Sequence, residues 1–133
     1  MKTFDVQSVG IKAGAADVFA FVSNPANLPR WTGAFKRADA ATADLATAGG
    51  AVTIRLDTLA DSKAGTVDWK MTFPDGSVGM AYSRITPDGE RNAVYSFVLM
   101  APPVPLEALE GALAAQMKLL AEELLSLKTL LEA

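Results

Sequence analysis

Hydrophobic and polar residues alternate through the middle of the chain, and this pattern predicts β-strands. Val52, Ile54 and Leu56 are separated by single polar residues, which is the period of a strand with one buried face. Strands with this kind of pattern are expected over 3–11, 51–59, 66–73, 77–85 and 91–100. The alanine-rich segment 34–45 is a weaker signal for one more strand. The run of strands predicts a largely antiparallel sheet.

Two Pro-Asp-Gly sequences separate the last three of these strands, and such sequences favour hairpin turns. As three-residue loops they would pair Phe73 with Ser77 and Thr86 with Glu90. Ala81 would then lie opposite both Trp69 and Tyr95, whereas two-residue loops would place Tyr82 there instead. Both alternatives give one shared face, formed by Trp69, Met71, Phe73, Tyr95, Phe97 and Leu99.

A helical periodicity replaces the alternation near the end of the chain. Apolar residues recur every three or four positions there, at Leu106, Leu109, Leu113, Met117, Leu120, Leu124, Leu127 and Leu131. The spacing predicts one helix from about Pro105 to Leu131, roughly 40 Å long at 1.5 Å per residue. Such a helix could cover the sheet. The same spacing resembles heptads, so a coiled-coil dimer is the alternative.

A short helix is also expected over 13–23, directly after the first strand. Val18, Phe19 and Val22 form a compact apolar stripe at helical spacing. Asp17 lies near the expected start, where a carboxylate interacts favourably with the helix dipole.

A break in the helical pattern follows at Asn24 and Pro25. Asparagine is a favourable N-cap and proline suits the first position of a helix, so a second short helix is expected to start here. Pro29 restricts the residue before it and predicts that this helix ends after about one turn. Leu28 and Trp31 would be its apolar anchors.

Composition narrows the chemistry that the chain can perform. The 133 residues include no cysteine and no histidine, which excludes disulfides, thiolate nucleophiles, Ser-His-Asp triads and zinc held by cysteine or histidine. No dense carboxylate motif indicates another metal site, and no cofactor is expected. The net charge is −3 and no basic cluster occurs, so nucleic acid is not an expected partner.

The expected location follows from two further patterns. The first residues lack the apolar run of a signal peptide, and no stretch reaches the ~20 apolar residues of a membrane span. We therefore expect no membrane span and a cytoplasmic protein.

The segment from Ile11 to Trp31 (IKAGAADVFAFVSNPANLPRW) carries a resemblance to a known family. With the order of elements above, it resembles the START and birch-pollen-allergen superfamily of helix-grip proteins (SRPBCC), and most of all its polyketide cyclase/dehydrase-like branch. The resemblance implies one α+β domain over residues 1–133. In it a curved antiparallel sheet wraps around the long C-terminal helix, and two short helices follow the first strand.

The resemblance also implies an apolar cavity between the sheet and the C-terminal helix. We expect this cavity to bind a small hydrophobic or aromatic molecule. Its expected lining residues are Trp31, Trp69, Met71, Tyr95, Phe97, Leu113 and Met117. A polyketide cyclase or dehydratase is an alternative, with Tyr95, Tyr82 and Arg84 as candidate acid–base groups. A protein-interaction role, with the long helix as the surface for a homodimer or for another partner, is a further alternative.

Overall fold

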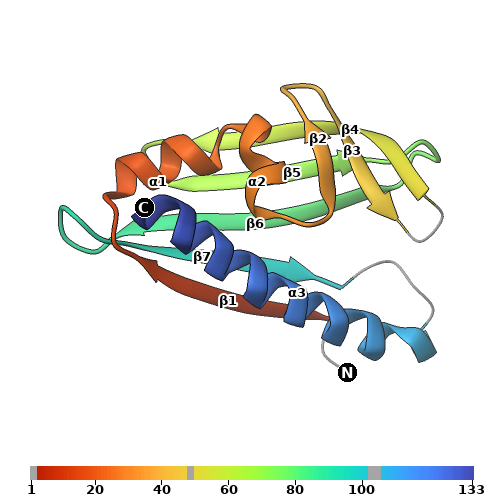
Figure 1. Cartoon of the computed structure of the whole chain (residues 1–133). Coiled ribbons are helices and arrows are strands. Elements are labelled where there is room, and N and C mark those ends of the chain that lie inside the picture. The colour runs from red at the N-terminus through yellow and green to blue at the C-terminus, as the bar shows by residue number, and fades with distance from the viewer. Residues whose placement is uncertain (1–2, 48–49, 102–105) are drawn as a thin grey trace.

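The computed structural model describes the backbone of residues 3–47, 50–101 and 106–133, and the side chains of 3–46, 50–101 and 113–133. Within these residues, seven strands, one helix of eight residues, one helix of 27 residues and two short helical turns follow one another (Figure 1). In chain order they are β1 (Phe4–Ile11), α1 (Ala15–Val22), the 3₁₀ turn η1 (Pro25–Asn27), α2 (Leu28–Trp31), β2 (Phe35–Ala38), β3 (Thr42–Thr47), β4 (Gly50–Asp61), β5 (Thr66–Thr72), β6 (Val78–Pro87), β7 (Ala93–Met100) and α3 (Leu106–Glu132).

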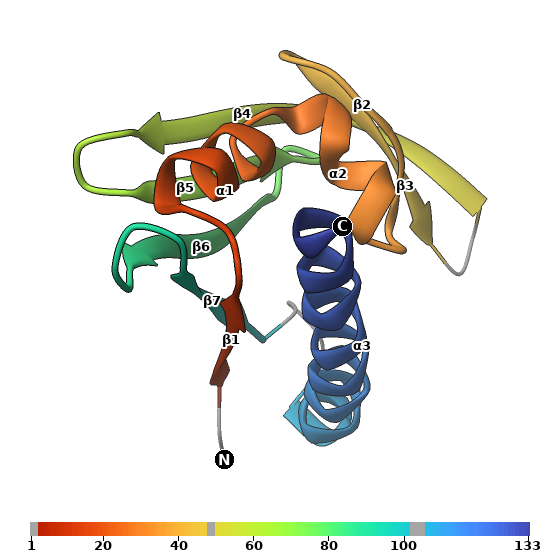
Figure 2. The ribbon, with the colours of Figure 1, turned by 60° about the vertical axis from the view of Figure 1, so that its left-hand side comes forward.

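All the strands belong to one antiparallel sheet, in the order β1-β7-β6-β5-β4-β3-β2. The first strand pairs with the last, so β1 and β2 form the two edges. Figure 2 shows that the sheet curls and that α3 lies within its concave side, while α1, η1 and α2 cross at one end. The predicted helix-grip fold is therefore confirmed.

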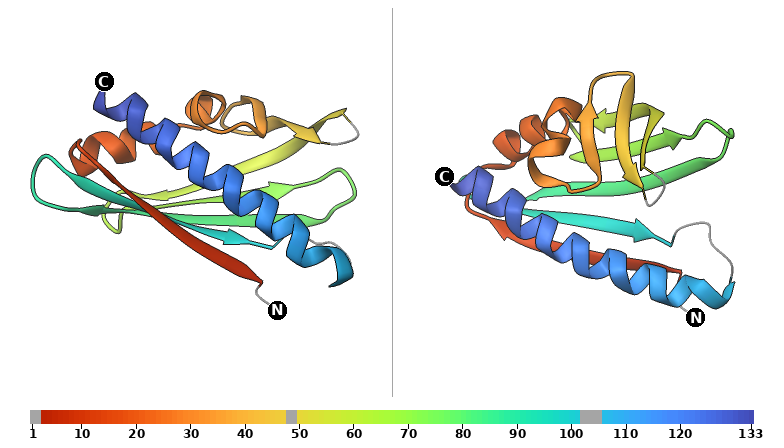
Figure 3. Two further views of the ribbon diagram at one scale, coloured as in Figure 1. Left: turned by 60° about the horizontal axis from the view of Figure 1, so that its bottom comes forward. Right: turned by 45° about the vertical axis from the view of Figure 1, so that its right-hand side comes forward.

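The long helix packs on its own sheet, so the coiled-coil alternative is wrong. Its stripe is used inside the molecule: Leu120, Leu124 and Leu127 are buried in the same cluster as the concave side of the sheet. Figure 3 shows α3 running beside β1. One polar contact joins them, because Gln7 Nε2 donates a hydrogen bond to the Met117 carbonyl oxygen (2.8 Å). The predicted stripe residues Leu106 and Leu109 lie outside the described side chains.

The β5–β6 turn has the predicted three-residue form. The Phe73 N–H donates to the carbonyl oxygen of Ser77 (2.9 Å), and Gly76 takes the positive φ of +88° that such a turn needs. Trp69 therefore lies opposite Ala81, and both side chains point to the concave face.

The β6–β7 turn differs from the prediction by four residues. The expected pairing of Thr86 with Glu90 is wrong, because this strand pairing places Ile85 opposite Tyr95. Both of those side chains are buried, and their mutual packing outweighs the local preference of the Pro-Asp-Gly sequence. A shift of four keeps every side chain on its predicted face. Ala81 thus shares the concave face with Tyr95 but does not lie opposite it.

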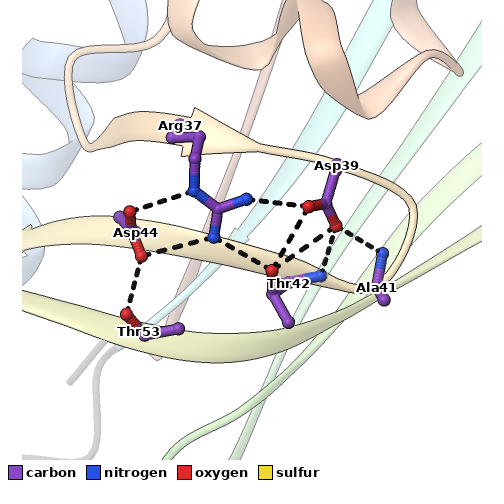
Figure 4. A network of polar contacts seen from close by, with 6 residues as sticks. All are labelled: Arg37, Asp39, Ala41, Thr42, Asp44 and Thr53. Atoms are coloured by element: carbon purple, nitrogen blue, oxygen red, sulfur yellow. Dashed lines mark hydrogen bonds and ion pairs between the residues drawn. The ribbon is translucent and has the colours of Figure 1, made fainter.

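The segment 34–45 forms two strands where one weak strand was expected. The turn between β2 and β3 is held by a polar network around Arg37 (Figure 4). Its guanidinium contacts Asp39 (2.8 Å), Thr42 (2.9 Å) and Asp44 (3.0 Å), and Asp44 also accepts a hydrogen bond from Thr53 on β4 (2.7 Å). Hydrogen bonds from the Ala41 and Thr42 N–H groups, and then from Arg37, lower the pKa of Asp39, and hydrogen bonds from Arg37 and Thr53 lower that of Asp44. The network thus ties β2, β3 and β4 together where alanine offers little packing.

Strand β1 reverses the usual arrangement of polar and apolar residues. Asp5 and Gln7 point to the concave side, and Asp5 is only 7 % exposed. Phe4 and Val6 point outward and are 46 % and 55 % exposed. Ile11, at the other end of the strand, is buried on the concave side. The sequence pattern predicted the strand but not this reversal.

Candidate functional site

An aromatic cluster occupies the concave face of the sheet, and most of the predicted lining residues belong to it. Trp31 and Tyr95 meet edge to face, with ring centroids 6.1 Å apart. Trp69 and Phe97 are stacked at 6.2 Å. Because Tyr95 and Phe97 are alternate residues of β7, the two aromatic pairs are neighbours on one face. Met71 follows Trp69 on the same face of β5 and is half-buried.

The cap at Asn24 positions Trp31, as the sequence indicates. Asn24 Oδ1 accepts a hydrogen bond from the Ala26 N–H (3.1 Å), and η1 and α2 follow it. Leu28 adopts helical angles although proline follows it, so Pro29 lies in the first turn of α2 instead of ending the helix. Leu28 and Trp31 are 2 % and 4 % exposed. The interruption of the helix at Asn24 and Pro25 therefore places the Trp31 indole against Tyr95 of β7.

Several buried side-chain polar atoms have no hydrogen-bond partner among the described residues, and three of them belong to the aromatic cluster. They are Trp31 Nε1, Thr32 Oγ1, Thr58 Oγ1, Trp69 Nε1 and Tyr95 OH. Thr58 lies opposite Trp69 in the pairing of β4 with β5, so their side chains share the concave face. Buried polar groups are nearly always paired in native proteins, and each unpaired one costs about 1–3 kcal/mol. The cluster therefore offers hydrogen-bonding groups that the described protein leaves unused.

Among these groups the Tyr95 hydroxyl is the one that titrates, and its pKa is strongly raised. Complete burial raises the pKa of its phenol far above the ordinary value, and the Asp68 carboxylate adds to this rise. The nearby Ser83 hydroxyl offsets only part of it. Ser83 donates its own proton to the Val67 carbonyl oxygen (2.5 Å), and its position does not give Tyr95 a hydrogen bond of acceptable geometry. Tyr95 is therefore a neutral hydrogen-bond donor at ordinary pH.

The other predicted site residues lie elsewhere. Tyr82 and Arg84 are exposed on the convex face of β6, opposite to the face that holds Tyr95. On α3, Leu113 is 3 % exposed and Met117 is half-buried. The contribution of these two residues to a ligand site stays a prediction.

Sequence reasoning missed a half-buried carboxylate between α2 and α3. Glu123 accepts a short hydrogen bond from the Gly33 N–H (2.6 Å), just after α2. Burial raises the pKa of this carboxyl, and the contact with Gly33 counters the rise in part. The residue lies off the leucine stripe, so nothing in the helical pattern distinguished it from the exposed glutamates. Thr58, in contrast, could have been found by extending the alternation of β4 two residues beyond Leu56.

Two hollows lined by described residues lie away from the aromatic cluster. One, of about 330 Å³, lies between α1 and the β4–β5 turn and includes Phe19 and Lys63. The other, of about 510 Å³, lies beside the β2–β3 turn and includes Thr42 and Arg55. Neither is lined by a residue of the predicted cavity.

The described part of the chain contains neither a metal-binding cluster nor a helix that could span a bilayer. No group of three or more histidine, cysteine, aspartate or glutamate residues is gathered there in a way that could hold a metal ion. Among the same residues, no helix is long and apolar enough to cross a membrane.

Solved structures share this architecture. XoxI from Bacillus cereus matches with a TM-score of 0.71 at 12 % identity, over 98 % of this chain and 96 % of that one. A START superfamily protein from Mycobacterium smegmatis gives 0.70 at 15 % identity, over 98 % of both chains. The Zhui aromatase/cyclase from Streptomyces sp. R1128 gives 0.67 at 10 % identity, over 97 % and 93 %. At these identities the likeness shows the START-like fold alone.

The family of this chain is shown by a match to a protein-family model, whereas the solved structures show only its fold. No curated protein matches the chain. The model described as "Polyketide cyclase / dehydrase and lipid transport" matches residues 5–132, which is nearly the whole chain. The match confirms the resemblance that the Ile11–Trp31 segment carried, and the chain belongs to the polyketide cyclase/dehydrase and lipid transport family.

Proposed function

We propose that this protein binds a small aromatic or otherwise apolar molecule between the concave face of its sheet and α3. Membership of the family implies a hydrophobic ligand-binding cavity. The ligand that fits this chain best is a flat apolar body that carries hydrogen-bond acceptors such as carbonyl oxygens. Its rings would stack on the aromatic cluster, and its acceptors would pair with the buried donors there.

The observation that carries this proposal is the set of unpartnered donors. Indole Nε1 can only donate, so Trp31 and Trp69 both require an acceptor, and neutral Tyr95 offers a third donor. All three lie among apolar side chains on one face. A ligand with acceptor atoms would pair these groups, whereas a pure hydrocarbon would leave them unpaired.

The gradient of burial along the concave face supports entry from one end. Near α1, the concave side chains Val67 of β5 and Tyr95 of β7 are fully buried. Toward the other end of the same strands, Met71 and Phe97 keep partial exposure to solvent. A ligand would approach from this second end and displace little of the buried core.

Binding is better supported than catalysis. A general base must lose its proton near the working pH, and the raised pKa of Tyr95 opposes this. The exposed positions of Tyr82 and Arg84 separate them from the cluster. The Zhui protein is an aromatase/cyclase, but the likeness of this chain to it extends to the fold alone.

A direct experiment is native mass spectrometry of the protein purified from its own organism. A retained small molecule of the expected class would support the proposal. In parallel, the neutral probe N-phenyl-1-naphthylamine should quench tryptophan emission, since Trp31 and Trp69 both belong to the cluster. Absence of both a retained molecule and any probe binding would refute ligand binding at this site.

A pair of variants locates the probe. Ala81→Leu adds bulk to the concave face opposite Trp69. It should lower the affinity for the probe, measured by tryptophan quenching, at least about fivefold. Met80→Leu is the matched control, because Met80 is the preceding residue of β6 and points to the convex face. Equal binding by both variants would place the probe elsewhere.

A further inference from the structure

The convex face of the sheet is polar over one region and apolar over another. On β5 the outward residues are Thr66, Asp68, Lys70 and Thr72. This is the usual arrangement for an antiparallel sheet with one face in water. On β1, β7 and β6 the outward residues are instead largely apolar. We name six of them the convex patch: Phe4, Val6, Val78, Tyr82, Val98 and Met100.

Strand pairing makes this patch continuous across three strands. Phe4 lies opposite Met100, Val6 opposite Val98, and Val98 opposite Tyr82. Directly opposed side chains on one face are about 5 Å apart, so these residues touch or nearly touch one another. None of the six is charged. Val78 is 52 % exposed, Met100 43 % and Tyr82 38 %.

The sequence of β7 points to cover on both faces. The residues from Phe97 to Met100 are all apolar, although Phe97 and Leu99 point inward while Val98 and Met100 point outward. Near-continuous apolar runs are typical of strands that are buried on both sides. In β1, Phe4 and Val6 likewise point outward while polar residues point inward. Two adjacent strands, β1 and β7, therefore both place apolar residues on the face that is usually polar.

We propose that the convex patch is the interface with a second copy of this chain. The six residues are uncharged, and the outward charged residues Asp68, Lys70 and Arg84 border them on β5 and β6, so two copies can bury the patch while these charges stay at its solvated rim. Their sheets would stack about 10 Å apart, as in β-sandwiches, with the outward side chains interdigitating. A charged partner would find no complementary charge within the patch.

The size of the patch sets the strength of the dimer. From their exposed fractions, the six residues present roughly 400–500 Å² of largely apolar surface, which is the size of the largest patch on a typical monomer, and such patches are often functional. With a polar rim, this corresponds to the lower end of specific interfaces. The dimer is therefore weak, with a dissociation constant of the order of micromolar to tens of micromolar.

The α3 helix provides the contrasting surface. Its leucine stripe is covered by the sheet, and it still exposes Leu119 and Leu125, the latter by 60 %. Six positions separate these two residues, so they lie on different sides of the helix and form no common stripe. Leu125 therefore serves as an exposed apolar control outside the patch.

Sedimentation velocity of the whole chain, from about 5 µM to about 500 µM, tests the proposal. The wild-type protein should pass from monomer to dimer across this range. Val6→Lys and Tyr82→Lys, on two different strands, should each raise the dissociation constant at least about tenfold. Leu125→Lys should leave it unchanged. Circular dichroism establishes that each variant is folded, and Tyr82→Lys suffices if the substitution in β1 prevents folding.

Three outcomes would overturn the proposal. One is a wild-type protein that stays monomeric throughout the range. Another is a dimer that folded Val6→Lys and Tyr82→Lys leave intact. The third is a dimer that Leu125→Lys weakens as much as the patch variants do, which would place the interface on α3.

Discussion

Replacing Tyr95 with phenylalanine should stabilise the unliganded protein and weaken its binding of ligands that carry acceptors. The Tyr95 side chain is fully buried and its hydroxyl lacks a hydrogen-bond partner among the described residues. An unpaired buried group of this kind destabilises the folded state by about 1–3 kcal/mol. Removing the oxygen atom relieves this cost but leaves a small packing defect, which reduces the gain by about 0.5 kcal/mol. We therefore expect Tyr95→Phe to gain about 1 kcal/mol in the free energy of unfolding, measured by urea denaturation, and to raise Tm by about 3–5 °C.

The matched ligands fluorenone and fluorene test the second half of this prediction. They share a flat ring system, but only fluorenone carries a carbonyl acceptor. If Tyr95 donates to that carbonyl, Tyr95→Phe should reduce fluorenone affinity about fivefold and leave fluorene affinity nearly unchanged, because one hydrogen bond contributes about 1 kcal/mol. Destabilisation of the unliganded variant would mean that the hydroxyl already has a partner, most directly Ser83. An unaltered ratio of the two affinities in Tyr95→Phe, Trp31→Phe and Trp69→Phe would refute the role of the donors.

Three further substitutions, one of them with a matched control, test local features of the fold. Asn24→Ala should lower the free energy of unfolding by about 1 kcal/mol through loss of the cap, and an unchanged urea midpoint would contradict this. Burial raises the pKa of Glu123 in the folded state, so its favourable contribution exists below its unfolded pKa and is lost as pH rises through the folded pKa. Glu123→Gln should therefore gain stability relative to wild type as the pH rises above the usual glutamate pKa, and a difference that stays constant with pH would refute the shift. Gly65→Ala should cost about 2–4 kcal/mol, because φ is +74° and a Cβ would clash with the Ile85 carbonyl oxygen. The control Gly76→Ala, with a positive φ but open space, should cost only about 1 kcal/mol.

The sequence was most informative where one face of a strand is buried. In β4, Ile54 and Leu56 show their facing through strict alternation, and the structure buries both. In β5, Trp69 could be placed on the same face as Tyr95 without knowing the turn type, because parity alone fixes the face. The aromatic cluster was predictable for this reason.

Prediction failed where a local signal competed with packing at a distance. The Pro-Asp-Gly sequence after Thr86 favours a tight turn, but the burial of Ile85 against Tyr95 sets the pairing of β6 with β7. Similarly, the alanine-rich segment around Arg37 gave a weak strand signal, because a polar network stabilises that hairpin. Neither the network nor the long-range contact is visible in a short window of sequence.

The unpartnered donors could not be predicted, because burial and hydrogen bonding are properties of the assembled structure. A lone tryptophan such as Trp31 most often serves packing, and its sequence gives no sign that Nε1 lacks an acceptor. The apolar residues Phe4 and Ile11 did hold a clue to β1, since their positions differ by an odd number. They therefore cannot share one face of a regular strand.

Strand β7 contributes to both proposals through opposite faces, and this makes them separable. Tyr95 and Phe97 point into the aromatic cluster, whereas Val98 belongs to the convex patch. A side-chain change on one face of a strand leaves the other face in place as long as the strand pairing holds. Tyr95→Phe should therefore alter the fluorenone affinity without changing the dimer dissociation constant. Tyr82→Lys should have the reverse effect, because its side chain lies on the convex face of β6. If either variant altered both measurements by a similar factor, ligand binding and dimer formation would be coupled, and the assignment of the two functions to separate faces would be wrong.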